Sequence, residues 1–431
     1  MPARATQGAE ARDWSWVEAS VWTERMVSAL DNGVKGGRWY SLMDKVYALA
    51  TLKAAWDKVK ANGGAAGVDG VSIARFAARE EVYLAELATA LEEGTYRPQP
   101  VRRVLIPKGD GRKRPLGIPA VKDRIVQTAV KFAIEPIFEA CCGPASYGFR
   151  PGRGCKDALR EVDRLLNDGY CFVVDADLQS YFDTIPHERL LERVAERISD
   201  GRVLDLIGGW LRQDILDGLD RWTPVGGTPQ GAVISPLLAN LYLNPLDERM
   251  AALGYRMVRY ADDFVVLCKS RIEAEAALAE VTAWVAENGL KLNVAKTHIG
   301  DCRRPGEGFD FLGYRFAAGR RTVRKKSLDR LKQAIREKTR RTRGASLACV
   351  IADLNPTLRG WFGYFKHAHP FIFGVLDGFI RRRLRAVLRK QQKRPGLGRC
   401  RADHQRWPNA FFAKAGLFAL EAAWQDARHS R

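Results

Sequence analysis

Apolar segments that end in acidic residues recur in the middle of the chain. In residues 256–269, RMVRYADDFVVLCK, apolar and polar positions alternate before two acids, and an apolar run follows them. This pattern predicts a β-hairpin with Asp262 and Asp263 at its tip. Residues 171–183, CFVVDADLQSYFD, contain another apolar strand, and it delivers Asp177 at its end. Asp is also a favoured turn residue, so the hairpin by itself indicates no more than a turn.

The carboxylate of a second strand changes this interpretation. Carboxylates from neighbouring strand ends can bind Mg²⁺ ions, which prefer oxygen ligands. Two such ions about 3.5–4 Å apart can bind both the attacking and the leaving oxygen of a phosphoryl transfer. The three acids therefore predict a nucleotidyl transferase that uses two metal ions.

Helical periodicity dominates the rest of the chain, with a few further strands. Two short strands, 101–106 and 115–118, flank the basic sequence GDGRKR and predict a second hairpin, and FDFLGYRF at 309–316 predicts one more strand. Apolar residues three and four apart predict helices over 17–30, 41–62, 75–93, 123–141, 272–288, 327–342, 347–366 and 373–392. The fold class is therefore α+β, with a palm-like antiparallel sheet followed by a helical bundle.

The positive charge of the chain is concentrated near its C-terminal end. The formal net charge is +20, and residues 320–343 hold twelve Lys and Arg against two acids. Residues 378–406 hold eleven against one. Two concentrated basic blocks predict a nucleic-acid partner. The aromatic cluster at 361–365 has helical spacing, which favours a core role over base stacking.

Cysteine usage and hydropathy exclude several other classes of protein. The eight cysteines form no CxxC pair and mostly have apolar neighbours, so we expect buried free thiols rather than a zinc site or disulfides. The N-terminus lacks the apolar core of a signal peptide, and the longest uncharged run contains four prolines. We therefore expect a cytoplasmic, nucleoid-associated protein with no membrane segment.

Nine motifs in fixed order resemble the bacterial group II intron-encoded reverse transcriptases/maturases, and the resemblance covers the chain from about Ser41 to its end. The last motif resembles the signature of the maturase domain, which separates intron-type enzymes from retron and retroviral relatives. The motifs are AAWDKVKANGGAAGVDG, IPKGDGRKRPLGIP, ASYGFRPGRGCKDAL, VVDADLQSYFD, GTPQGAVISPLLANLYL, YADD, LKLNVAKT, FDFLGYRF and LNPTLRGWFGYFKHAH.

The resemblance implies a right-hand polymerase fold with fingers and palm, followed by a helical thumb/maturase domain. It implies an RNA-directed DNA polymerase that adds dNTPs to a primer 3′-OH with two Mg²⁺ ions, for which Mn²⁺ could substitute. Asp177, Asp262 and Asp263 would be the catalytic and metal-binding residues. Phe182 would exclude a ribose 2′-OH, and its spacing of five residues from Asp177 favours this role over that of a core aromatic. The other implied dNTP-binding residues are Lys108, Arg114, Gln230 and Lys296.

The same resemblance implies group II intron RNA, an RNA template and a DNA primer or target as partners. The enzyme would bind its intron RNA to promote splicing and mobility. Dimerisation through the fingers is a further option that the sequence leaves open. We expect the RNA contacts to include Arg324, Lys325, Lys326, Arg336, Arg340, Arg341, Arg381, Arg382 and Arg385.

The expected domains are an N-terminal extension (1–40), fingers and palm (41–318), thumb/maturase (319–393) and a short basic, aromatic DNA-binding tail (394–431). The HNH-type nuclease domain of many relatives, with its paired cysteines, is not found, so we expect priming from another source. Two alternative functions remain open. One is a splicing-only RNA-binding maturase, and the other is a domesticated reverse transcriptase in DNA repair or phage defence.

Overall fold

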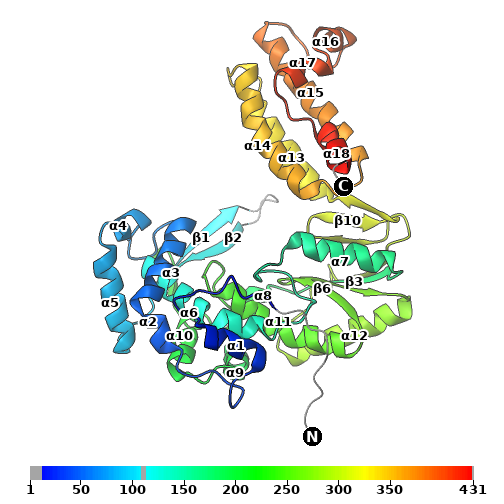
Figure 1. The fold of residues 1–431 in the computed structure, drawn as a ribbon. Helices are drawn as coiled ribbons and strands as arrows, with labels where there is room; N and C mark the ends of the chain where they lie inside the picture. The colour runs from blue at the N-terminus through cyan, green and yellow to red at the C-terminus, as the bar shows by residue number, and fades with distance from the viewer. Residues whose placement is uncertain (1–11, 108–112, 430–431) are drawn as a thin grey trace. The chain divides into compact units, whose positions relative to one another are not determined.

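The computed structural model describes residues 12–107 and 113–429, and these form two compact units (Figure 1). The first unit comprises residues 1–170 and 174–298, and the second comprises 171–173 and 299–431. The first unit holds helices, most of two sheets and all of the predicted acids. The second holds a small sheet followed by helices. This mixed architecture matches the α+β class that the sequence predicts.

The helices of the first unit surround its sheets. Helix α6 is deeply buried, and its buried residues include the polar Asp123, Arg124, Gln127 and Thr128 as well as apolar ones. The helices are α1 (Glu24–Asn32), α2 (Met43–Tyr47), α3 (Leu49–Asn62), α4 (Ile73–Ala77), α5 (Glu80–Glu92), α6 (Val121–Glu139), α7 (Cys155–Asn167), α8 (Tyr181–Thr184), α9 (His187–Ala195), α10 (Gly201–Leu211), α11 (Ser235–Ala252) and α12 (Arg271–Glu287).

Three sheets are found among the described residues. Their strand orders are β2-β1-β4-β5, β6-β7-β3-β8 and β11-β10-β9. The strands are β1 (Val101–Pro107), β2 (Lys113–Ile118), β3 (Phe172–Asp177), β4 (Ile215–Asp217), β5 (Asp220–Trp222), β6 (Arg256–Tyr260), β7 (Asp263–Cys268), β8 (His298–Asp301), β9 (Phe309–Phe311), β10 (Tyr314–Ala317) and β11 (Arg320–Val323). Strands β1 and β2 pair antiparallel, as do β6 and β7, so both predicted hairpins are confirmed.

Several predicted elements differ from the structure. The segment 309–316 is two strands rather than one, because Leu312 and Gly313 both have positive φ and turn the chain back on itself. The predicted helix 75–93 is interrupted at residues 78–79, and the predicted helix 17–30 begins only at Glu24. The sequence analysis did not predict the hairpin of β4 and β5.

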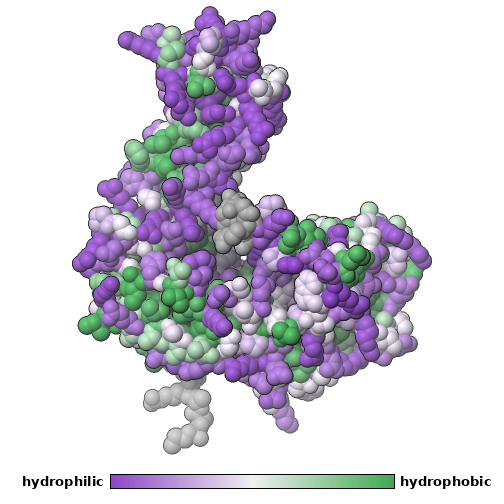
Figure 2. Space-filling view, turned by 180° about the vertical axis from the view of Figure 1, so that it is seen from behind, coloured by the Kyte–Doolittle hydropathy of each residue, from purple (hydrophilic) through white to green (hydrophobic). Residues whose placement is uncertain are grey.

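The second unit contains a bundle of amphipathic helices. These are α13 (Lys325–Lys338), α14 (Leu347–Phe365), α15 (Phe371–Gln391), α16 (Arg401–Arg406), α17 (Asn409–Lys414) and α18 (Leu420–His429). Their apolar faces form one core that includes Leu354, Phe362, Phe373 and Phe412. The aromatic residues at 361–365 are buried or half-buried in this region, so their predicted core role is confirmed. Figure 2 shows a mostly hydrophilic surface on the upper helices in that view.

The cysteines agree only in part with the expectation of buried free thiols. All eight are free, but only Cys268 and Cys302 are buried, four are half-buried, and Cys349 and Cys400 are exposed. Within 12–107 and 113–429, no helix combines the length and the apolar character that crossing a membrane requires.

Candidate polymerase active site

The hairpin of β6 and β7 presents Asp262 at a tight turn. Tyr260 is paired with Asp263 at the last position of the ladder, so Ala261 and Asp262 form a two-residue turn. Ala261 has a φ of 60°, a conformation that a residue with a side chain adopts only when its surroundings enforce it. Asp262 is half-buried, whereas Asp263 is exposed at the start of β7.

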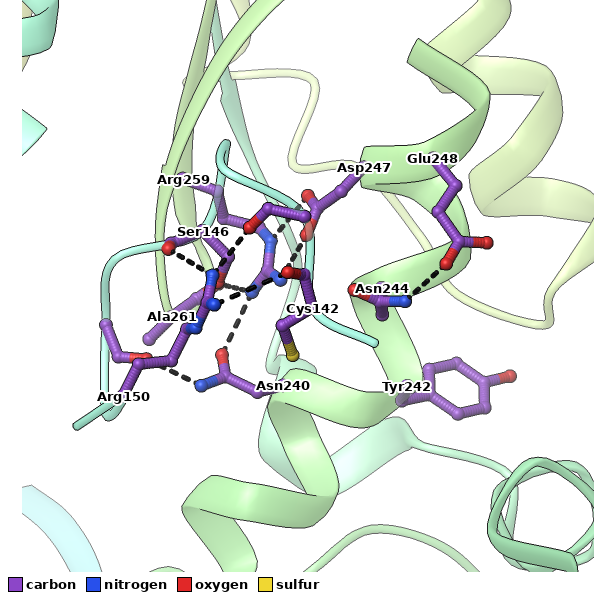
Figure 3. A network of polar contacts seen from close by, with 12 residues as sticks. Cys142, Ser146, Arg150, Asn240, Tyr242, Asn244, Asp247, Glu248, Arg259 and Ala261 are labelled. Carbon is purple, nitrogen blue, oxygen red and sulfur yellow. Dashed lines mark hydrogen bonds and ion pairs between the residues drawn. The ribbon is translucent and has the colours of Figure 1, made fainter. Parts of the chain in front are cut away.

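A buried arginine supports this turn from behind. The side chain of Arg259 is 0% exposed and forms an ion pair with Asp247, whose side chain is 2% exposed. Its Nη1 donates hydrogen bonds to the Ala261 carbonyl oxygen at 2.9 Å and to Asn240 Oδ1 at 3.0 Å. Figure 3 shows the guanidinium turned toward these acceptors. Arg259 therefore holds the carbonyl next to Asp262 in a fixed position.

The loop before α7 packs on the same turn. Tyr147 donates its backbone N–H to the Arg259 carbonyl, and Arg259 donates its own to Ala145. A Cβ atom on Gly148 would lie 2.4 Å from the backbone nitrogen of Ala261, so only glycine fits there. The motif SYGFRPGRG thus supports the hairpin of β6 and β7, a role that the sequence analysis did not predict.

Asp177 ends β3 and is held by the segment that carries Lys296. Asn293 donates its backbone N–H to the Asp177 carbonyl at 2.7 Å. The Lys296 Nζ lies 2.8 Å from Asp177 Oδ2 in an ion pair between two largely exposed side chains. Lys296 lies in the turn before β8. The ammonium therefore neutralises part of the charge at this strand end.

The carboxylates of Asp177 and Asp262 interact electrostatically. Burial raises the pKa of Asp262, and the Asp177 carboxylate raises it further, while Arg114 and Arg259 oppose this shift. Mutual repulsion of this kind is relieved when a divalent cation binds between two carboxylates.

The donor set fits a Mg²⁺ ion that keeps some of its water. Within the described ranges, no group of three His, Cys, Asp or Glu side chains is close enough to hold a metal ion by itself. Mg²⁺, however, is commonly bound by one or two carboxylates together with substrate phosphates. Asp177 and Asp262 provide such a pair of hard oxygen ligands.

A cavity of about 700 Å³ lies in the first unit, lined by Phe182, Gln230 and residues of β1, β2, β4 and β5. Gln230 Oε1 accepts a hydrogen bond from Arg114 Nε at 2.8 Å, and its Nε2 donates to Asp183 Oδ1 at 3.3 Å. Phe182 is half-buried at the wall. The structure thus brings Arg114, Phe182 and Gln230 together.

Close backbone contacts fix the Pro-Gln-Gly turn against β2. Gly117 donates its N–H to the Gln230 carbonyl at 2.6 Å. A Cβ on Gly231, which has a φ of 111°, would lie 2.3 Å from the Gly117 carbonyl oxygen. The turn therefore requires glycine, and its rigidity sets the position of the Gln230 side chain.

The remaining predicted residues have varied surroundings. Lys108 lies outside the described residues. Arg324, Lys325, Lys326, Arg336, Arg340 and Arg341 are exposed, whereas Arg381 and Arg382 are half-buried. Arg385 is only 2% exposed, and its guanidinium donates to the Trp407 carbonyl and to Asn409. Contrary to the prediction, Arg385 has no exposed guanidinium for RNA, because it ties α15 to the segment after α16.

Sequence reasoning missed the supporting residues of the site. Arg259 occupies a strand position where a basic residue usually faces solvent, and Asp247 and Asn240 lie on α11, far from it in sequence. One feature of the sequence could have indicated that Arg259 is buried. Residue 259 falls between two apolar positions of its strand, beside a helix rich in small residues. Asp183 was also not predicted as a partner of Gln230.

Comparisons with known proteins agree with this geometry. Residues 106–316 match the family model described as "Reverse transcriptase (RNA-dependent DNA polymerase)". Residues 328–407 match the model "Group II intron, maturase-specific domain". Both matches fall on the segments that carry the expected polymerase and maturase motifs.

Individual relatives extend these matches. The protein YkfC of Escherichia coli is 39% identical over 293 residues, which are 58% of this chain and 75% of that protein. The group II intron-encoded protein LtrA of Lactococcus lactis is 38% identical over 180 residues, which are 42% of this chain and 30% of LtrA. Among solved structures, a chain in a partial Cas6-RT-Cas1–Cas2 complex is 26% identical, with a TM-score of 0.37, over 60% of this chain and 43% of its own.

The two family models, in this order on one chain, join a polymerase to an intron-type maturase segment. YkfC shows that the similarity extends over most of a relative's length. The reverse transcriptase model also implies dependence on a divalent metal ion. The chain belongs to the group II intron-encoded reverse transcriptases, which are RNA-directed DNA polymerases that carry a maturase domain.

Proposed function

We propose that two Mg²⁺ ions bind at Asp177 and Asp262, with Asp263 beside them, and that a dNTP occupies the cavity lined by Phe182 and Gln230. The observation that carries the proposal is the pair of mutually repelling carboxylates at two strand ends of one sheet. When bound, the ions would activate the primer 3′-OH and neutralise the leaving pyrophosphate.

The residues of the chain would position the reactants. Arg114 and Gln230 hold each other at 2.8 Å, so both are preorganised for the triphosphate and the sugar. Lys108 would bind the triphosphate with Arg114. Lys296 balances the charge of Asp177 and would lie near the pyrophosphate, where its ammonium can donate a proton.

Phe182 would select deoxynucleotides, since its ring lines the cavity next to Gln230. A Phe182→Val variant should incorporate ribonucleotides at least about ten-fold better relative to dNTPs, because the smaller side chain leaves room for a 2′-OH. Primer extension with each nucleotide set measures the ratio. An unchanged ratio, with normal dNTP extension, would show that Phe182 is a core residue and not a gate.

We propose that the second unit binds the RNA of its group II intron and promotes splicing and mobility. The support is the match to the maturase-specific domain together with the exposed cations of α13 and the turn after it. Such contacts neutralise phosphates and make affinity strongly dependent on salt.

A splicing assay with the cognate intron RNA tests this role. Replacing Lys325, Lys326 and Arg340 with alanine should slow assisted splicing while a short primer–template is still extended. Normal splicing by this variant would contradict the role of these cations. Dimerisation, association with the nucleoid and use of Mn²⁺ stay predictions.

A further inference from the structure

The second unit contains a cavity of about 470 Å³. None of the residues predicted to contact RNA lines it. Three separate segments line it. These are the start of β11 with the residue before it, the turn between α14 and α15, and the last helix, α18. The volume is in the range of cavities that hold small ligands, about 300–1,000 Å³.

The lining is strongly cationic. Arg320, Lys366 and Arg428 line the cavity together with His369, and no carboxylate is among the lining residues in the described part of the chain. Helix α15, which is 21 residues long, begins directly after Pro370 at the cavity wall. Its N-terminal dipole adds positive potential to that of the side chains. The cavity is therefore suited to an anion.

Hydrogen bonds hold two of the lining segments together. The Arg321 Nε donates to the His367 carbonyl oxygen at 3.1 Å. The backbone N–H of His369 donates a hydrogen bond to the Arg321 carbonyl oxygen at 2.8 Å. The guanidinium of Arg321 also lies over the Tyr314 ring, 5.1 Å from its centroid. These contacts fix the strand and the turn before any ligand arrives.

The third segment, α18, is fixed by a buried carboxylate. Asp377 accepts the backbone N–H groups of Leu420 and Glu421, which open the helix. Trp424 then stacks on Phe373 with the ring centroids 6.4 Å apart. Arg428 covers the Trp424 ring at 5.6 Å from its centroid. The cavity thus has a cationic and aromatic wall that is preorganised.

We propose that this cavity binds a phosphodiester of a single-stranded RNA segment, with Arg320, Lys366 and Arg428 around the phosphate. Cations and an indole side by side are typical of sites that hold a phosphate and its neighbouring base. The proposal deepens the RNA-binding role proposed above and rests on it for the source of the phosphate. The other source of the same chemistry is a free mononucleotide or inorganic phosphate.

The test compares two double variants of the full-length chain that lose equal charge. Lys366→Ala/Arg428→Ala alters the cavity, and Lys35→Ala/Arg38→Ala removes two exposed cations of the first unit. Fluorescence anisotropy measures binding of a labelled single-stranded RNA of about 20 nucleotides at several salt concentrations, a length chosen to exceed the span of one site.

The cavity variant should bind about ten-fold more weakly than wild type, and its salt slope should fall by about 0.7 for each phosphate that it no longer neutralises. The control should bind like wild type. Lys366→Arg/Arg428→Lys, which keeps both charges, should retain affinity. Equal affinity and slope for the cavity variant and the control would overturn the proposal.

Competition with AMP and with inorganic phosphate distinguishes the two sources. An RNA site predicts that neither displaces the strand at micromolar concentration, and displacement by AMP at that level would overturn the assignment to a strand. Extension of a saturating primer–template by wild type and the cavity variant, measured beside RNA binding, distinguishes failure of this inference from failure of the proposed function. If wild type binds no RNA, the proposed function fails, whereas binding that the cavity variant retains in full contradicts only this inference.

Discussion

The buried ion pair between Arg259 and Asp247 should make a large contribution to the stability of the hairpin of β6 and β7. Both side chains are almost completely inaccessible to water, and the guanidinium also donates hydrogen bonds to Asn240 Oδ1 and to the Ala261 carbonyl oxygen. Arg259→Met would leave a carboxylate buried without a partner, and breaking such a pair costs about 3–5 kcal/mol. Replacing both partners with apolar residues avoids this penalty, because no charge remains buried.

Urea unfolding of wild type, Arg259→Met, Asp247→Leu and the double variant forms a thermodynamic cycle that measures the interaction. We expect each single variant to lose about 3 kcal/mol or more, and the double variant to lose at least about 2 kcal/mol less than the sum of the two. A single variant within about 1 kcal/mol of wild type, or strictly additive losses, would refute this reasoning.

The same variant should also affect catalysis. Without the hydrogen bond to its carbonyl, Ala261 is free to leave its positive φ, and Asp262 loses its fixed direction. The double variant is the informative one, because it removes this bond without leaving an unpaired charge buried. We expect its kcat for primer extension to fall about ten-fold or more with little change in dNTP KM, as for an interaction that matters in the transition state. An unchanged kcat would show that Arg259 is needed for folding alone.

Three further predictions follow from the packing. Gly148→Ala should reduce primer extension and destabilise the chain by about 1–3 kcal/mol, because its Cβ would collide with Ala261, whereas Gly143→Ala, with open space around it, should be neutral in both assays. Gly231→Ala should raise the dNTP KM in steady-state extension by displacing the Pro-Gln-Gly turn from β2, and an unchanged KM would contradict the assigned packing. Burial raises the pKa of Asp123 from 3.8 to about 6, so this carboxyl stabilises the fold below about pH 4 and loses that contribution as pH rises through 6. Relative to Asp123→Asn, wild type should lose about 2 kcal/mol between pH 4 and pH 7 in urea unfolding, and a constant difference would exclude the shift.

The sequence predicted the elements whose signals are local. The hairpin of β6 and β7 follows from an apolar run around two acids, and the amphipathic helices of the second unit follow from their periodicity. These patterns also located Asp177 and Asp262 at strand ends. Carboxylates at neighbouring strand ends suggested Mg²⁺ binding, and the ordered motifs added the expected place of these acids in a polymerase.

The features that sequence reasoning missed depend on tertiary contacts. Arg259 has the sequence pattern of a surface residue, and only α11 brings it a carboxylate. The turn at Leu312 and Gly313 divides a strand, because a non-glycine residue with positive φ leaves no clear signal in the sequence. Arg385 resembles its basic neighbours, yet its direction on α15 buries it. For Arg259 and Arg385 the deciding partners lie on other segments, whereas the turn at Leu312 and Gly313 is set by local backbone conformation.

The most direct test of the central claim is extension of a DNA primer on an RNA template with Mg²⁺ and dNTPs by wild type and Asp262→Asn. Asp220→Asn, which alters an exposed acid of β5, is the matched control. We expect wild type and the control to extend the primer, and Asp262→Asn to be at least about 1,000-fold slower, because it would lose a proposed metal ligand. Its affinity for the same RNA should be unchanged. Near-normal extension by Asp262→Asn would contradict the assignment of this carboxylate to the catalytic site.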